Sequence, residues 1–153
     1  MDVRYINPFI NATKEILHSL TSYECKPGRA FVKTNDVALG DVTGIIGITG
    51  VVNGTIAVTF DEKSILTIVS MMFDEQFTKV DEEIIDAVGE LTNMVSGHAI
   101  NELVQLGFNF NISVPTVIAG KNHSVTHHTG GPKVAIPFSI ADGKFTIEVS
   151  FDK

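Results

Sequence analysis

The amino-acid sequence predicts an α+β fold, a layered sandwich in which helices cover a mostly antiparallel sheet. Two pairs of β-rich segments are joined at Asn53-Gly54 and at Asp142-Gly143, dipeptides that are typical of β-hairpins. Three other segments repeat apolar residues with the period of an α-helix. The order is helix, strands, two helices, strands, without a linker or low-complexity stretch, so we expect residues 1–153 to form a single domain.

The first helix is expected to begin at Asn7 and Pro8 and to end near Ser22. Asparagine is a favoured N-cap, and proline is favoured at the first helical position because its fixed backbone angle suits a helix. The apolar residues of this segment follow helical spacing: Phe9, Ala12, Ile16 and Leu20.

A turn and three strands are expected next. Residues 25–28 (Cys-Lys-Pro-Gly) are predicted to turn the chain, and residues 29–35 to form a short edge strand. Residues 43–52 and 55–60 are predicted to be the strands of the first hairpin. The first of these strands carries three glycines, which indicate bulges or the close approach of another element: Gly44, Gly47 and Gly50.

Two helices are predicted in the middle of the chain. Asp61 is the expected N-cap of the first, whose apolar residues repeat at helical spacing. The second is expected to begin near Asp81, to run to about Leu106 and to end at Gly107, because glycine is favoured just after a helix. The apolar set of the first of these helices is Ile65, Ile68, Val69, Met72 and Phe73.

The C-terminal part of the chain is predicted to return to β-structure. Residues 111–119 are expected to form a strand that contains Pro115, and proline in a strand indicates a sheet edge or a bulge. Residues 120–132 form a polar loop in this prediction, and the strands 133–140 and 145–151 form the closing hairpin.

The composition argues against several classes of function. The net charge of −7 argues against binding to nucleic acid and to an anionic membrane surface, both of which require a basic face. Cys25 is the only cysteine, so a disulfide framework and a thiolate metal cluster are excluded, and a reducing, cytoplasmic location is expected. The first residues lack the pattern of a signal peptide, and no apolar run approaches the roughly 18 residues that span a bilayer.

The most informative residues lie on one face of the helix that follows Asp81. Asp86, Glu90 and Asn93 fall within roughly 60° of one another around the helix axis, and Gly97 lies one turn further on. A carboxylate and a carboxamide one turn apart can bind a partner's cation and hold a water molecule. The opposite face is apolar and is expected to anchor the helix: Ile84, Val88, Leu91, Val95, Ala99 and Leu106.

These residues resemble the signature of the CheC/CheX/FliY family of phosphatases that act on phosphorylated CheY. The signature is Asp or Ser, three residues, Glu, two residues, Asn, about twenty-one residues and Pro, which here reads Asp86, Glu90, Asn93 and Pro115. The single copy resembles the CheX branch, and CheC has two sites. The resemblance also covers Ile-Asn-Pro-Phe-Ile (6–10), Gly-Asp-Val-Thr-Gly-Ile-Ile-Gly (40–47) and residues 80–99.

The resemblance implies a CheC/CheX-like fold and a specific activity. The substrate would be the aspartyl phosphate of a CheY-like response regulator, whose receiver domain supplies Mg²⁺, so that the chain needs no cofactor or metal of its own. By analogy, Asn93 orients the attacking water and Glu90 pairs with the receiver's lysine. Asp86 would support docking at the rim, and Pro115 would shape the strand beside the helix. A homodimer with strands shared across the interface is also implied.

Physical reasoning agrees with these roles. Phosphoryl transfer depends mainly on positioning the water and neutralising charge, and a carboxamide can both donate to and accept from a water. Gly97 would let a partner approach the helix closely, at a cost of about 1 kcal/mol of helix stability relative to alanine.

Other readings remain open. The same fold could dock a receiver or a flagellar-switch component without catalysis, or form a structural dimer whose polar helix face is only solvated. The histidines of the polar loop, His123, His127 and His128, suggest a metal site. Adjacent histidines in an extended segment point in opposite directions, however, so a solvated loop is expected instead of a zinc site.

Overall fold

The computed structural model describes residues 3–152, which contain three helices and eight strands. In chain order these are α1 (Val3–Thr21), β1 (Lys26–Pro27), β2 (Phe31–Lys33), β3 (Val42–Gly50), β4 (Gly54–Phe60), α2 (Glu62–Phe73), α3 (Glu82–Gln105), β5 (Phe110–Ile112), β6 (Thr116–Ala119), β7 (Lys133–Ile140) and β8 (Gly143–Phe151). In the part of the chain that is described, no helix is long and apolar enough to cross a membrane.

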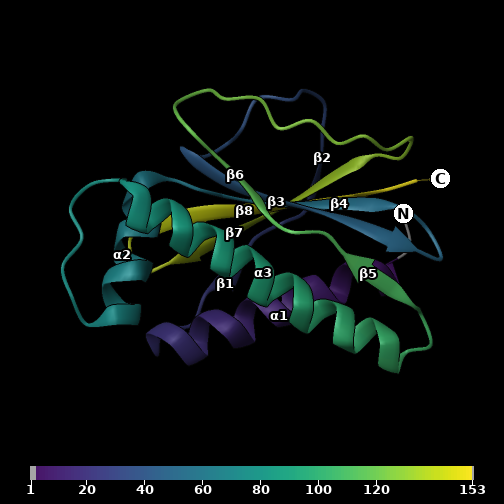
Figure 1. Cartoon of the computed structure of the whole chain (residues 1–153), viewed down its shortest axis with the longest axis horizontal. Coiled ribbons are helices and arrows are strands. Elements are labelled where there is room, and N and C mark those ends of the chain that lie inside the picture. Colours follow the sequence, from purple (N-terminus) through teal and green to yellow (C-terminus); the bar gives the residue numbers. More distant parts are fainter. Residues whose placement is uncertain (1–2, 153) are drawn as a thin grey trace.

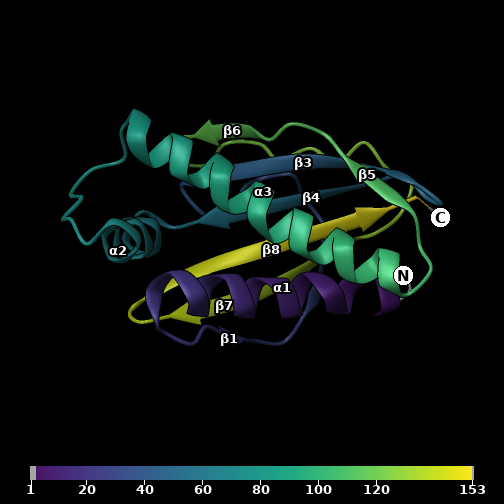
Figure 2. The same cartoon turned by 60° about the horizontal axis from the view of Figure 1, so that its bottom comes forward.

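The strands form one antiparallel sheet with the order β1-β7-β8-β4-β3-β5. β2 also pairs with β7, and β6 also pairs with β3, so each edge of the sheet consists of two short strands. All three helices lie on one face of this sheet, as Figures 1 and 2 show. The predicted α+β sandwich is therefore confirmed.

The main core lies between the sheet and the helices. Alternate residues of β8 point toward the helices, because successive side chains of a strand point to opposite faces. These residues are Phe145, Ile147, Val149 and Phe151, and all four are buried. Phe9 and Leu17 of α1 and Ile65 of α2 belong to the same cluster, so the sheet and its helices share one core.

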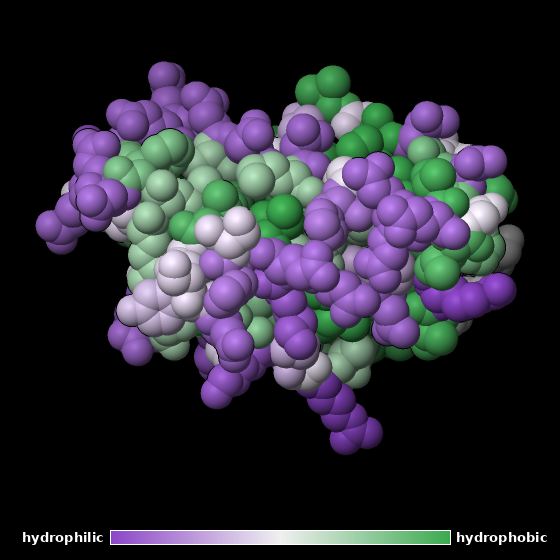
Figure 3. Space-filling view, turned by 90° about the horizontal axis from the view of Figure 1, so that it is seen from below, coloured by the Kyte–Doolittle hydropathy of each residue, from purple (hydrophilic) through white to green (hydrophobic). Residues whose placement is uncertain are grey.

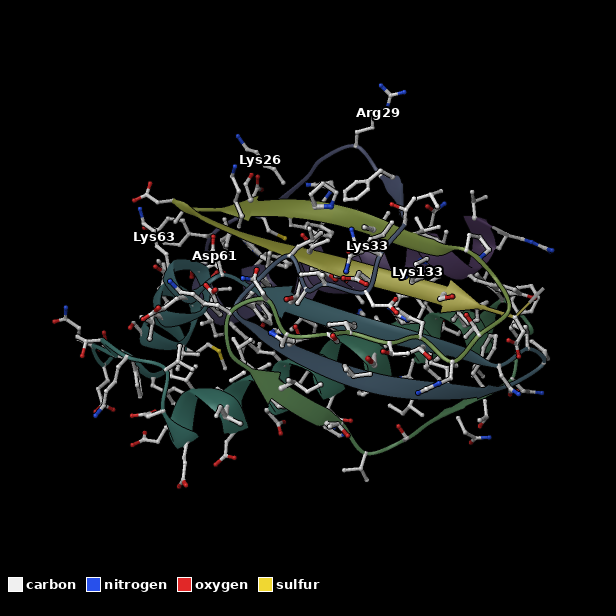
Figure 4. All side chains as sticks on the ribbon, turned by 90° about the horizontal axis from the view of Figure 1, so that it is seen from above. Lys26, Arg29, Lys33, Asp61, Lys63 and Lys133 are labelled. Carbon is white, nitrogen blue, oxygen red and sulfur yellow. The ribbon has the colours of Figure 1, made fainter. Side chains whose placement is uncertain are left out.

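Loops cover the opposite face of the sheet, above the strands in Figure 1. Lys33 Nζ lies 2.9 Å from Glu148 Oε2, and His127 Nε2 lies 3.1 Å from Glu148 Oε1. Figure 4 shows Lys33 lying over the sheet, whereas Arg29 points away from it. Burial raises the pKa of Glu148. Hydrogen bonds from His127 and Lys33 lower it by more than burial raises it, so the pKa of Glu148 lies below its usual value.

The expectation that the histidine loop is solvated is wrong for His127. Its side chain is 1% exposed, because Glu148 on β8 binds it from beneath. His123 is also engaged: its Nε2 lies 2.6 Å from Thr43 Oγ1 on β3. No group of three or more metal-ligating side chains occurs among residues 3–152.

The start of α1 differs from the prediction. The helix begins at Val3, so Asn7 is not its N-cap and Pro8 lies inside it. The reason is tertiary packing that the local sequence cannot reveal. The ring of Tyr5 packs edge-on against Phe108 at 5.1 Å and Phe110 at 5.8 Å between centroids, and this packing favours a helical first turn.

The capping predictions for the next two helices are confirmed. The Asp61 carboxylate accepts a hydrogen bond from Ser64 N at 2.7 Å, and the Asp81 carboxylate accepts from Glu83 N at 3.1 Å. Gly107 follows α3 with a φ of 95°, a conformation that favours glycine.

Both predicted hairpins form, but their turns lie elsewhere. Gly54 is the first residue of β4 and is buried. A β-carbon there would lie 2.4 Å from Phe151 Cδ1, so the residue packs closely against that ring. The second turn precedes Gly143, which pairs with Ile140. The segment 25–28, expected as a turn, contains the two-residue strand β1.

Candidate functional site

The central helix α3 positions the residues singled out by the sequence. Asp86, Glu90 and Asn93 are exposed on one face of this 24-residue helix. The opposite face is buried against the sheet and α1, as predicted for Ile84, Val88, Leu91, Val95 and Ala99. Leu106 departs from that prediction: it is 56% exposed because it is the C-cap, beyond the last helical turn.

Close contact between α3 and β3 fixes the height of the helix above the sheet. A β-carbon at Gly44 would lie 1.9 Å from Thr92 Oγ1, so only glycine allows this approach. Thr92 is fully buried, and its hydroxyl donates to Val88 O at 2.7 Å within the helix. Gly44 therefore marks the close approach of another element, one of the two roles that the sequence indicated for the glycines of this strand.

The predicted strand 111–119 is interrupted, and the interruption lies beside α3. Ile112 pairs with Ile48 of β3, whereas Thr116 pairs with Ile45, so residues 113–115 lie opposite only residues 46–47. This one-residue excess is a β-bulge, and it separates β5 from β6. Proline cannot donate a ladder hydrogen bond, which is consistent with the position of Pro115 in this bulge at the sheet edge.

The bulge turns two side chains of this edge toward α3. A β-carbon at Gly89 would lie 3.4 Å from Val117 Cγ2 and 4.0 Å from Pro115 Cγ. Because the bulge adds one residue, the alternation of side chains shifts by one, and both Pro115 and Val117 face the helix. Gly89 was missed by the sequence analysis, although its spacing of three residues from Asp86 places it on the same helical face.

Between the helix face and the bulged edge lies a shallow groove with a volume of about 350 Å³. Asp86, Glu90 and Asn93 form one side, and Pro115 lies on the other. The complete lining is Ile85, Asp86, Gly89, Glu90, Asn93, Pro115 and Val117. The structure thus brings together the four positions of the signature, which are separated by up to 29 residues in the sequence.

The polar groups of the groove have no internal partners. Among residues 3–152, the side chains of Asp86, Glu90 and Asn93 form no hydrogen bond or ion pair. Glu82 and Glu83 in the first turn of α3 are also exposed and unpaired within those residues, so this end of the groove carries a negative charge. A cation and a water brought by a partner would find free carboxylate and carboxamide groups here.

Gly97 extends this surface by one helical turn. A β-carbon at Gly97 would meet nothing within 4 Å, so packing inside the chain does not explain the glycine. Figure 3 shows the helix-bearing face of the molecule, where hydrophilic side chains cover much of the surface. Because Gly97 has no side chain, a partner molecule can approach the backbone of α3 closely beside Asn93.

Comparison with known proteins places the chain in a family. The family described as chemotaxis phosphatase CheX matches residues 42–139. The chain is 29% identical over 141 residues to the CheY-P phosphatase CheX of Thermotoga maritima, covering 92% of this chain and 90% of that protein. The structure of a CheC-like superfamily protein from Shewanella sp. PV-4 is similar with a TM-score of 0.94, 41% identity and 100% coverage of both chains.

A solved complex is also similar. The CheX–CheY–BeF3–Mg²⁺ complex from Borrelia burgdorferi matches with a TM-score of 0.83 at 25% identity, over 97% of this chain and 98% of that chain. The family match covers more than half of the chain, and the structural likeness extends over its whole length. The chain therefore belongs to the chemotaxis phosphatase CheX family.

Proposed function

We propose that this chain is a phosphatase that hydrolyses the aspartyl phosphate of a phosphorylated CheY-like response regulator. The observation that carries the proposal is the pair Glu90 and Asn93, exposed in the groove and unpaired within residues 3–152. The Thermotoga relative is named a CheY-P phosphatase, and the Borrelia relative is solved with CheY, BeF3 and Mg²⁺. Both findings support a CheY-like partner for this chain.

Asn93 is the residue proposed to orient the attacking water. Its carboxamide can accept a hydrogen bond from the water and donate another to a phosphoryl oxygen. Hydrolysis of an acyl phosphate needs an in-line water more than a strong base, because the carboxylate leaving group departs readily. The packing of α3 on β3 through Gly44 and Thr92 holds the backbone of Asn93 in place for this task.

Glu90 is proposed to pair with the lysine of the receiver's active site. Its carboxylate lies one helical turn before Asn93, so the cation and the water would be held side by side. Asp86 would add a second negative charge at the rim of the groove. The Mg²⁺ would be supplied by the receiver, which the Borrelia complex with CheY, BeF3 and Mg²⁺ supports.

The test compares Asn93→Ala with a matched control, Asn101→Ala, which removes an exposed asparagine from the same helix. Loss of phosphate from a phosphorylated CheY-type receiver is followed with Mg²⁺ present. Binding is measured separately with the receiver held by Mg²⁺ and beryllofluoride. We expect the wild type and Asn101→Ala to accelerate hydrolysis, and Asn93→Ala to lose about 100-fold in rate while it still binds.

The competing function has a distinct result in this test. A docking module would bind the receiver without accelerating phosphate loss, and Asn93→Ala would then change nothing. A purely structural domain would fold normally and bind no receiver. Either result across the available receivers would contradict the phosphatase assignment.

We also propose that the chain acts as a single-domain homodimer in the reducing cytoplasm. The two-residue and three-residue strands β1 and β2 leave one sheet edge open, and β2 exposes Phe31 (44%) and Val32 (61%). An open edge with apolar residues can pair with a second copy of the chain. The free, buried Cys25 fits the expected compartment. Sedimentation of wild type and Val32→Lys tests the dimer, which the lysine should weaken.

A further inference from the structure

The bulge between β5 and β6 projects an apolar side chain into solvent beside the groove. Val114 is 85% exposed, compared with 63% for Val3 and 61% for Val32, the next most exposed large apolar side chains among residues 3–152. We infer that Val114 is a specificity-determining contact of the receiver-docking surface, outside the residues of the signature. This inference rests on the proposed function, because its occupant is the CheY-like receiver.

Hydrogen bonds of Ser113, the residue directly before Val114, fix this part of the bulge to β3. Gly47 N donates to Ser113 Oγ at 2.9 Å, and Ser113 N donates to Gly47 O at 2.9 Å. Ser113 Oγ also donates to Val114 O at 3.3 Å. Pro115 restricts the backbone of the residue before it to extended conformations. Val114 is therefore an exposed side chain on a fixed backbone.

The direction of the chain places Val114 on the Asn93 side of the groove. β5 lies beside the C-terminal part of α3 and β6 beside its N-terminal part, as Figure 1 shows. Pro115 and Val117 lie against Gly89. Val114 directly precedes the groove residue Pro115 and is one residue closer to β5, so along the chain it lies toward the end of the groove that carries Asn93.

The chemistry of this position suits a docking contact. A single exposed apolar residue is ordinary on a protein surface. Val114 differs because its backbone is pinned and valine has a stiff side chain, so little conformational freedom is lost when a partner covers it. An apolar contact at the rim also excludes bulk water from the polar groups that it surrounds. Here those groups are Glu90 and Asn93, which are proposed to hold the receiver's lysine and one water.

The experiment uses Val114→Ser, which removes apolar surface without adding charge. The matched control is Val37→Ser, because Val37 is an exposed valine (45%) that bridges to Ser124 in the loops on the opposite face of the sheet. Affinity is measured for a CheY-type receiver with Mg²⁺ and beryllofluoride, and kcat and KM are measured with the phosphorylated receiver. We expect Val114→Ser to raise Kd and KM about fivefold to tenfold, with kcat and Tm nearly unchanged. Val37→Ser should match the wild type.

Each contrary outcome has a separate meaning. If the wild type hydrolyses the phosphoreceiver and Val114→Ser binds it equally well, the inference is overturned while the phosphatase function stands. If the wild type neither binds nor hydrolyses, both are overturned. If Val114→Ser changes self-association in sedimentation and leaves Kd unchanged, Val114 is a contact between copies of the chain, and the inference is likewise overturned.

Discussion

Gly44 lies directly beneath Thr92, and a β-carbon on the glycine would be only 1.9 Å from the threonine hydroxyl oxygen. This contact sets the distance between α3 and β3, so it also sets the position of the groove residues that the helix carries. The geometry proposed for Asn93 on α3 thus depends on Gly44, a residue of β3 that has no side chain.

Substitution of Gly44 should therefore damage both stability and activity. We expect Gly44→Ala to lower the free energy of unfolding by about 3 kcal/mol, because the added methyl group overpacks the core. The control is Gly47→Ala on the same strand, where a β-carbon would meet Ser113 Oγ at an ordinary 3.4 Å. Adding Thr92→Ala should restore only part of the loss, since Thr92 Cβ would still lie 2.9 Å away. Denaturant unfolding measures the stability of Gly44→Ala, of Gly47→Ala and of the double variant. Equal stability of the two glycine variants would show that the contact between Gly44 and Thr92 does not limit the packing of α3.

Gly97 should show the opposite balance between stability and function. The helix is expected to gain up to about 1 kcal/mol in Gly97→Ala, because alanine is the better helix former and the methyl group meets nothing within 4 Å. Receiver affinity should fall, since the methyl group would occupy the space of the approaching partner. Ser19→Ala in α1 is the control for added helix propensity alone. Thermal unfolding and receiver titration check this, and unchanged affinity would place Gly97 outside the interface.

The exposed carboxylates at the start of α3 should make the reaction sensitive to salt. Glu82, Glu83, Asp86 and Glu90 form no ion pair within residues 3–152, so their field is available to a cationic partner. We expect kcat/KM to fall as ionic strength rises from about 50 to about 200 mM, because the Debye length shortens. Glu83→Gln should flatten this dependence, whereas Glu24→Gln, next to β1, should not. A slope that is identical in all three proteins would exclude electrostatic steering by α3.

The buried cluster around Glu148 should appear in acid unfolding. The pKa of Glu148 is lowered in the fold by His127 and Lys33 against the effect of burial, so this carboxylate contributes stability above its unfolded pKa. That contribution is lost as the pH falls through the lower, folded pKa. We expect Glu148→Gln to lose roughly 3–5 kcal/mol at pH 7, because Lys33 is left buried without its partner.

The pH dependence distinguishes this cluster from an exposed pair. Unfolding free energy should fall more steeply for the wild type than for Glu148→Gln as the medium is acidified. Asp36→Asn is the comparison, because the pKa of Asp36 is also lowered, by Lys133, but this pair is partly exposed to solvent and contributes little. A variant that loses stability with acid as steeply as the wild type would show that Glu148 is not the responsible group.

Local chemistry in the sequence was enough to predict much of this fold. The caps Asp61 and Asp81 act on backbone groups two or three residues away, so their signals need no knowledge of tertiary structure. The same holds for the face shared by Glu90 and Asn93, which follows from the helical period alone. The order of helices and strands followed from apolar periodicity and hairpin dipeptides.

Features that depend on distant partners could not be predicted in this way. Tyr5 extends α1 by packing on rings more than one hundred residues away in the chain, and no local signal marks that contact. His127 is buried by Glu148 on another element. The division of the strand 111–119 depends on its pairing with β3, which becomes visible only when the register of both strands is known.

The bulge gives a physical meaning to the interval between Asn93 and Pro115. From Asn93 to Gln105 the helix advances about 18 Å, and from Asn109 to Pro115 the extended chain returns about 20 Å. The two distances nearly cancel, so the interval works as a ruler that brings the proline back opposite the asparagine. Losing one residue from this interval would turn Pro115 and Val117 away from Gly89, however well the replacement residues suited a strand. Substitutions between Asn93 and Pro115 should therefore be tolerated far more easily than insertions or deletions, which change the number of residues in the interval.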